Sequence, residues 1–229
     1  MINPWYETLG VFDLETTGIN PETSRIVSAH VGVIDASGDS VELRTWLADP
    51  GVEIPEGASA VHGITSARAR AEGRPAAEVV AEIITELKLI VARGIPVTIF
   101  NAPYDLTILD REARRYGVEP LAPPMPTVDP LILDKAMDRW RKGKRTLEAA
   151  ALVYGVVLDD AHNASADAVA AGRVAQAIGR RYEAELAMDA QELHRNQVAW
   201  AAEQAANFQA YMRSVKDPAF VADGSWPQR

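Results

Sequence analysis

Apolar and polar residues follow the pattern of β-strands over the first fifty positions. Residues 11–14 form a short apolar run that ends at Thr17–Gly18, and residues 25–34 are rich in β-branched side chains. Turn-forming residues at Asp35–Gly38 then lead into residues 41–47, which alternate between polar and apolar side chains. These three runs predict an antiparallel meander.

Apolar spacing changes to a helical period after Pro75, where a helix is expected to begin. Its core-facing positions are Val79, Val80, Ile83, Ile84, Leu87 and Ile90. Buried strands are expected at 97–100 and Thr127–Val128, each followed by a helix, the first of which ends at Gly117. Alternation of strand and helix favours a parallel arrangement in this part of the chain.

Two further helices are expected, from near Thr146 to Gly155 and from about 164 to 182. The predicted fold class is therefore α/β, with a mixed five-stranded sheet flanked by helices. Residues 183–213 contain no Gly or Pro and carry an apolar stripe, which predicts an appended C-terminal helix before a tail. We expect one domain over 1–182 and a helical extension with a tail over 183–229.

Composition narrows the class of protein. The chain has 229 residues and a net charge of −9, which argues against a polybasic protein that coats nucleic acid. It has no Cys, which excludes disulfides and Cys-ligated zinc. The net charge does not exclude an enzyme that binds nucleic acid through a local patch and metal ions. No apolar run approaches the roughly 20 residues that span a bilayer, and the start lacks a signal-peptide pattern. We therefore expect a soluble cytoplasmic protein without a membrane partner.

Two acids end the first predicted strand. In the segment Phe12–Gly18, alternation places Asp13 and Glu15 on one face and the apolar residues on the other. Neighbouring carboxylates repel each other unless a cation lies between them, and a hard divalent metal is the simplest such cation. Considered alone, however, the pair is explained better by a solvated strand end.

A third acid, Asp105, stands at the start of the helix that follows residues 97–100. It shares a helical stripe with apolar residues such as Ile108 and Leu109, so its side chain is expected to point inward, where a carboxylate needs a partner. The alternative is a first-turn acid that interacts with the helix dipole, beside Asn101 as an ordinary N-cap.

The fourth acid, Asp167, falls in the first turn of the helix expected at 164–182, on the stripe that includes Ala170 and Val174. His162 is expected in the loop before this helix, free to reach across the mouth of a site. A lone His in such a loop is more often a surface or packing residue, but the nearby inward acid favours a functional role.

Four inward carboxylates in one core call for bound cations. Four carboxylates and one His, without Cys, suit Mg²⁺ or Mn²⁺ rather than zinc. Two such ions roughly 4 Å apart would hold a phosphate for in-line attack by water. The residues therefore predict a phosphoryl-transfer site with two divalent metal ions.

Three segments, in this order, resemble the exonuclease motifs of the DnaQ-like (DEDDh) 3′–5′ exonucleases. They are Phe12–Gly18, Asn101-x-x-x-Asp105 and His162-x-x-x-x-Asp167, and Val61–Thr65 looks like a further family segment. The resemblance covers about residues 8–182 and implies a ribonuclease H-like fold, in agreement with the pattern of strands and helices. It also implies removal of nucleoside 5′-monophosphates from a 3′ end.

The resemblance implies a role for each motif residue. The metal ligands would be Asp13, Glu15, Asp105 and Asp167, with His162 as the general base that takes a proton from the attacking water. Residues expected to contact the terminal nucleotide are Leu14, Thr16, Thr17, Ile19, His62, Asn101 and Tyr104. Ile19 would act as an apolar wedge, and Tyr104 would either stack on a base or pack in its helix. Acids that match no motif, and are expected as caps, turns or solvated faces, are Asp129, Asp134, Asp159 and Asp160.

One basic cluster stands out in this acidic chain. Five positive charges lie within seven residues around Trp140: Arg139, Arg141, Lys142, Lys144 and Arg145. Lys142 and Lys144 are expected to contact nucleic-acid phosphates, which would make binding salt-dependent. The alternative is a solvated loop before the helix at Thr146.

The leading interpretation is a 3′–5′ exonuclease on single-stranded DNA ends, in proofreading or repair. The Thr16–Thr17 pair looks more like the proofreading type, because the oligoribonuclease type usually carries Met in place of Thr16. An exoribonuclease is the alternative, and a non-catalytic interaction module of a polymerase complex is a third interpretation. The C-terminal helix, with Trp200, Phe208 and Tyr211, could pack on the domain, dock on a DNA polymerase or form a homodimer.

Overall fold

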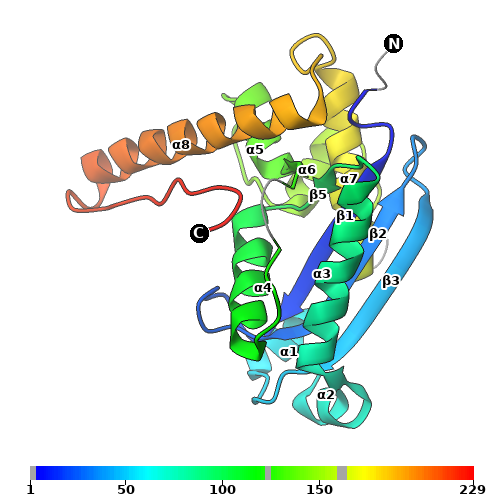
Figure 1. Ribbon diagram of the computed structural model, residues 1–229. Helices are drawn as coiled ribbons and strands as arrows, with labels where there is room; N and C mark the ends of the chain where they lie inside the picture. The colour runs from blue at the N-terminus through cyan, green and yellow to red at the C-terminus, as the bar shows by residue number, and fades with distance from the viewer. Residues whose placement is uncertain (1–3, 122–124, 159–163) are drawn as a thin grey trace.

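The structure is a computed structural model that describes residues 4–121, 125–158 and 164–229 (Figure 1). Its strands are β1 (Leu9–Thr16), β2 (Ile26–Ile34), β3 (Ser40–Asp49), β4 (Arg74–Pro75), β5 (Val97–Thr98) and β6 (Thr127–Val128). Its helices are α1 (Glu56–His62), α2 (Ser66–Glu72), α3 (Ala76–Ala92), α4 (Ala102–Tyr116), α5 (Pro130–Met137), α6 (Leu147–Tyr154), α7 (Ala164–Arg181) and α8 (Ala190–Val215).

The strands form one mixed sheet in the order β4-β3-β2-β1-β5-β6. The neighbours β1, β2 and β3 pair antiparallel, whereas β5 pairs parallel to β1 and β6 pairs parallel to β5. The predicted α/β class, with an antiparallel start and a parallel finish, is confirmed. Gly10 and Val11 of β1 pair with β5, so the ends of β5 and β6, where the connections to α4 and α5 begin, lie beside the first half of β1.

The prediction of five strands was wrong by one short edge strand. β4 pairs parallel to Ala48 and Asp49 at the end of β3. Gly73 permits this approach, because a Cβ there would lie 2.6 Å from the backbone of both residues. The short helices α1 and α2 were also not predicted, and the reason is that α1 buries no residue and α2 buries only Ala69.

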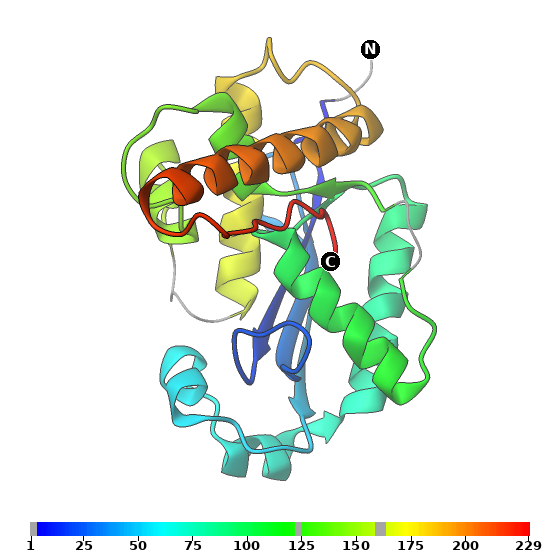
Figure 2. The same cartoon turned by 90° about the vertical axis from the view of Figure 1, so that its left-hand side faces the viewer.

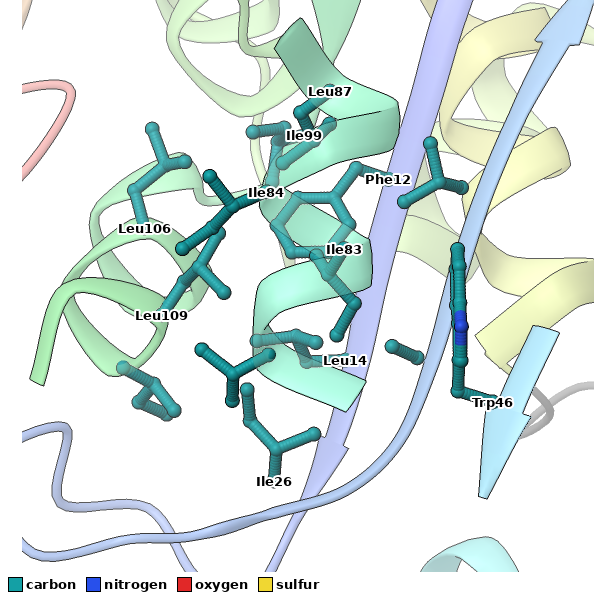
Figure 3. Close-up of a cluster of buried hydrophobic side chains, with 14 of the residues drawn as sticks. Phe12, Leu14, Ile26, Trp46, Ile83, Ile84, Leu87, Ile99, Leu106 and Leu109 are labelled. Carbon is teal, nitrogen blue, oxygen red and sulfur yellow. The ribbon is translucent and has the colours of Figure 1, made fainter. Parts of the chain in front are cut away.

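Helices cover both faces of the sheet. On one face, Phe12 of β1 packs against Ile83 and Ile84 of α3 and Leu109 of α4 (Figure 3). On the other face, Val11 packs against Val174 and neighbouring residues of α7. The alternation along β1 therefore decides which side chains enter each core, and it leaves Asp13 and Glu15 on the face of Val11.

The helix expected at 183–213 is observed as α8, and it begins later because Asp189 caps it through the N–H of Glu192. Its buried residues are Leu193, Gln197 and Ala201. Beyond α8, the chain returns beneath the helix and ends beside the start of α4 (Figure 2). None of the helices within the described ranges is long and apolar enough to span a membrane.

Candidate active site

Asp13 and Glu15 lie at the end of β1, both partly buried. The side chain of Leu14, between them, is buried in the core cluster of the opposite face. Strand alternation turns that side chain away from the acids, so the predicted contact of Leu14 with the terminal nucleotide would have to come from its backbone. Its backbone N–H stays on the acidic side and donates to Oδ1 of Asp105 at 3.1 Å.

Asp105 lies in the first turn of α4, and only 3% of its surface is exposed. The inward orientation predicted from the helical stripe is confirmed. The alternative of Asn101 as an ordinary N-cap is wrong, since its side chain makes no capping hydrogen bond and its backbone is left-handed at φ 61°. The backbone N–H groups of Asn101 and Ala102 donate instead to the carboxylate of Asp129, at 3.0 Å each.

Burial and mutual repulsion set the charge state of these acids. The pKa of Asp13 is raised well above its usual value by burial, and then by the charges of Asp105, Glu15 and Asp167. Burial, followed by the charge of Asp167, raises the pKa of Glu15 to about 7. Burial also raises the pKa of Asp105. Carboxylates from β1, α4 and α7 therefore lie within electrostatic reach of one another.

This set of oxygen donors fits a hard divalent cation. Buried carboxylates that hold each other's pKa high are stabilised when a cation neutralises them. As the side chains stand, no group of three or more His, Asp or Glu in the described part of the chain is arranged to hold a metal ion. The carboxylates would therefore have to converge further for one ion to bind several of them.

His30 lies opposite Asp13 in the register of β1 and β2, and it is fully buried. Within the described residues neither ring nitrogen has a hydrogen-bond partner. Burial lowers the pKa of His30 to about 4, so the ring is neutral near pH 7 and brings no positive charge to the acids. Sequence reasoning did not single out this residue.

Three oxygens tie the loop after β1 to α4. The Thr16 hydroxyl lies 2.9 Å from the carbonyl of Gly18 and 2.5 Å from the Tyr104 hydroxyl, which is itself 2.5 Å from that carbonyl. The two hydroxyl hydrogens are thus shared among three close oxygens. Tyr104 therefore acts through its hydroxyl on the loop that carries Ile19, and the side chain of Ile19 is 94% exposed beside the site.

His62, at the end of α1, lies close to the backbone of Thr16. Its Nδ1 accepts from the N–H of Ile64 at 3.2 Å, and its Nε2 is buried without a partner among the described residues. Burial lowers the pKa of His62, and proximity to the backbone of Thr16 opposes this shift. The segment Val61–Thr65 therefore comes close to the first motif, as a shared binding surface requires.

The remaining predicted residues are placed as follows. Asp167 lies in the first turn of α7 and is partly buried. Thr17 is buried, and its hydroxyl accepts from the N–H of Arg25 at 3.0 Å, which closes the base of the loop. His162, together with Asp159 and Asp160, lies outside the described residues.

The basic cluster divides into two parts. Arg141 and Arg145 are mostly buried and pair with Asp134 at 2.5 and 2.9 Å. Lys142 and Lys144 are exposed. Because Arg141 and Arg145 are paired with Asp134, the loop carries less unpaired positive charge than the sequence suggests. The expectation of a cap, turn or solvated role for Asp134 was wrong, because its carboxylate is buried and also accepts from the Tyr154 hydroxyl at 2.9 Å.

Asp129 was expected as a cap, turn or solvated acid, and only the first of these is right. It caps α5 through the N–H of Leu131, yet it is fully buried and also serves the start of α4. A strand followed by Asp and Pro was the available signal for the cap at α5. No sequence pattern indicates its second role at α4, because that contact bridges 28 residues.

Comparison with known proteins identifies a family for this chain. A family model described as exonuclease matches residues 11–175. A DNA polymerase III subunit epsilon-like protein of Rhodobacter capsulatus is 35% identical over 112 residues, which is 48% of this chain and 15% of that protein. The chain thus spans a small part of that relative.

Solved structures of exonuclease I share the fold. One has a TM-score of 0.67 at 21% identity over 79% of this chain and 42% of the other. The E. coli enzyme in complex with a dT13 oligonucleotide has a TM-score of 0.67 at 20% identity, over 79% and 43%. The fold is ribonuclease H-like, and the family match over most of the chain shows that it belongs to the DnaQ-like exonuclease family.

Proposed function

We propose that this chain is a metal-dependent 3′–5′ exonuclease that shortens single-stranded DNA and releases nucleoside 5′-monophosphates, in proofreading or repair. The main support is the group of desolvated carboxylates that β1, α4 and α7 bring within electrostatic reach of one another. A non-catalytic interaction module has no need for such repulsion in its interior. The four acids of the resemblance are all present, which favours an enzyme.

Each residue has a proposed task. Asp13, Glu15, Asp105 and Asp167 would hold two divalent ions, Mg²⁺ or Mn²⁺, which when bound neutralise the scissile phosphate and lower the pKa of the attacking water. His162 would take the proton of that water, because a neutral imidazole accepts a proton near pH 7. Ile19, Thr16 and His62 would contact the terminal nucleotide.

Two observations favour DNA over RNA. Exonuclease I, which shares this fold, has been solved with a dT13 oligonucleotide, and the relative from Rhodobacter capsulatus is named for a DNA polymerase subunit. An exoribonuclease is the competing proposal.

We also propose that residues 1–182 form the nuclease domain of a cytoplasmic protein and that residues 183–229 form an extension. The relative's name supports a DNA polymerase as a partner. Phe208 of the apolar stripe on α8 packs against the tail of the same chain, since its ring centroid lies 5.5 Å from that of Phe220. Tyr211 stays exposed on α8, where a polymerase or a second copy of the chain could bind.

The test is a degradation assay on 5′-labelled single-stranded DNA and RNA of one sequence, with Mg²⁺, Mn²⁺ or EDTA. We expect a ladder of 3′-shortened DNA that requires metal. Asp13→Asn and His162→Ala should each reduce the rate by about 10²-fold or more, whereas the matched control Asp39→Asn, on an exposed turn, should not. Faster degradation of RNA would favour the competing proposal, and no degradation of either polymer would refute both.

A further inference from the structure

Asp129 connects three parts of the chain that are distant in sequence. Its Oδ1 accepts from the N–H groups of Asn101 and Leu131, each at 3.0 Å. Its Oδ2 accepts from the N–H of Ala102 at 3.0 Å and from Nε1 of Trp226 at 3.1 Å. A single buried carboxylate therefore serves the start of α4, the start of α5 and the tail.

The start of α4 depends on this carboxylate. The first N–H groups of a helix have no partner within the helix, and a side chain at the N-cap usually supplies one. Asn101 supplies none, so Asp129 takes over the capping of α4. Asp105 follows in the same first turn, and its carboxylate is fixed to β1 through the N–H of Leu14.

The tail holds Asp129 from the far side. Trp226 is only 7% exposed and packs with Ile132 of α5 and Ala201 of α8. Its indole N–H donates to the same oxygen as the N–H of Ala102 does, which fixes the direction in which that oxygen points. Figure 2 shows the tail running beside the start of α4.

Helix α8 fixes the backbone of the same residue. Oε1 of Gln197 accepts from the N–H of Asp129 at 2.7 Å, and its Nε2 donates to the carbonyl of Thr127 at 2.9 Å. Both the backbone and the carboxylate of Asp129 are thus held by residues of the extension. A buried charge with all of its acceptors in use has little freedom to move.

We propose that Trp226 and Asp129 are positioning residues of the nuclease site. The indole N–H orients the carboxylate of Asp129, which holds the first turn of α4 and so sets the position of Asp105. The inference rests on the proposed function, because Asp105 matters there as a metal ligand. It makes residues beyond α8 part of the support of the site.

The central experiment replaces Trp226 by Phe, which keeps a ring and removes the N–H. Hydrogen exchange is first measured in EDTA at the amides of Leu14, Asn101 and Ala102. We expect about tenfold faster exchange at these amides, with little change in the second half of α4. With metal and single-stranded DNA, kcat should fall about tenfold while KM changes less than twofold. The matched control is Phe220→Leu, which loosens a tail contact that does not involve Asp129.

A double-mutant cycle tests the route through Asp129. Asp129→Asn should lower kcat more than W226F, and the double variant should be no slower than D129N alone, because both changes act on one hydrogen-bond network. Wild-type exchange and kcat in W226F would overturn the proposal, and so would effects that multiply in the double variant. Exchange in EDTA needs no activity, so it decides the positioning role even where an inactive wild-type chain refutes the proposed function.

Discussion

The backbone N–H of Leu14 donates to Oδ1 of Asp105, although the two residues are 91 positions apart. The contact joins the strand that carries two acids to the helix that carries a third. The side chain of Leu14 is meanwhile packed in the core with α3 (Figure 3). The position of Asp105 relative to Asp13 is therefore determined by core packing as well as by the site itself.

Glu15→Gln should change how folding stability depends on pH in the metal-free chain. The pKa of Glu15 is raised from 4.5 to about 7, so the folded state binds more protons than the unfolded state between these pH values. Stability contributed by this group is present below pH 4.5 and is lost as pH rises through 7. The rise in pKa converts to about 3 kcal/mol for a fully buried group, and because Glu15 is only partly buried the substitution should remove about 2 kcal/mol of that loss.

Urea unfolding at pH 4.5 and pH 8 in EDTA measures this effect. Glu56→Gln, at an exposed position in α1, is the control and should leave the difference between the two pH values unchanged. Equal pH dependence in wild type and E15Q would contradict the assigned burial and repulsion at Glu15.

Tyr104→Phe should weaken substrate binding more than turnover. The hydroxyl of Tyr104 holds the carbonyl of Gly18 and the hydroxyl of Thr16, and without it the loop that carries Ile19 gains freedom. One such hydrogen bond contributes about 1 kcal/mol, which corresponds to a rise in KM of roughly fivefold. Steady-state kinetics on a short oligonucleotide, beside the exposed-site control Tyr211→Phe, would show it. A wild-type KM would mean that base stacking or helix packing is the role of Tyr104.

Reversal of charge at Lys142 and Lys144 should weaken binding of single-stranded DNA and make it less sensitive to salt. Each phosphate contact contributes about 0.7 to the slope of log K against log salt for single strands, so losing two lowers the slope by about 1.4. Fluorescence anisotropy in EDTA at several salt concentrations measures the slope without hydrolysis. A slope like that of wild type would place the DNA away from this loop.

Asp134→Ala should lower the free energy of unfolding of the chain. The carboxylate is 1% exposed and binds Arg141, Arg145 and Tyr154, so its removal leaves buried cations without a counter-charge. Breaking such a pair costs about 3–5 kcal/mol. Denaturant titration compares it with Asp138→Ala, whose carboxylate lies 3.9 Å from Arg141 and is more exposed. Equal losses in the two variants would contradict this account.

The sequence predicted the orientation of side chains correctly where the period of the apolar positions indicates which residues are buried. The alternation of β1 separated Asp13 from Phe12, and the helical stripe of α4 turned Asp105 inward; both are confirmed. Periodicity carries no record of a contact between side chains in different elements. The hydrogen bond between Trp226 and Asp129 joins residues 97 positions apart. The ion pair between Arg145 and Asp134 neutralises a positive charge that appears unpaired in the sequence. The two-residue strand β4 is too short to produce any period.

The contacts of Asp129 also affect the order in which parts of the structure can form during synthesis. Chains leave the ribosome from the N-terminus, at about 5–20 residues per second, and domains fold as they emerge. Helix α4 is synthesised before Asp129, the residue that caps it. Another 97 residues must be synthesised before the indole of Trp226 can complete the hydrogen bonds of that carboxylate. The sheet can assemble early, whereas the hydrogen bonds of Asp129 at the start of α4 are complete only after the tail has been made.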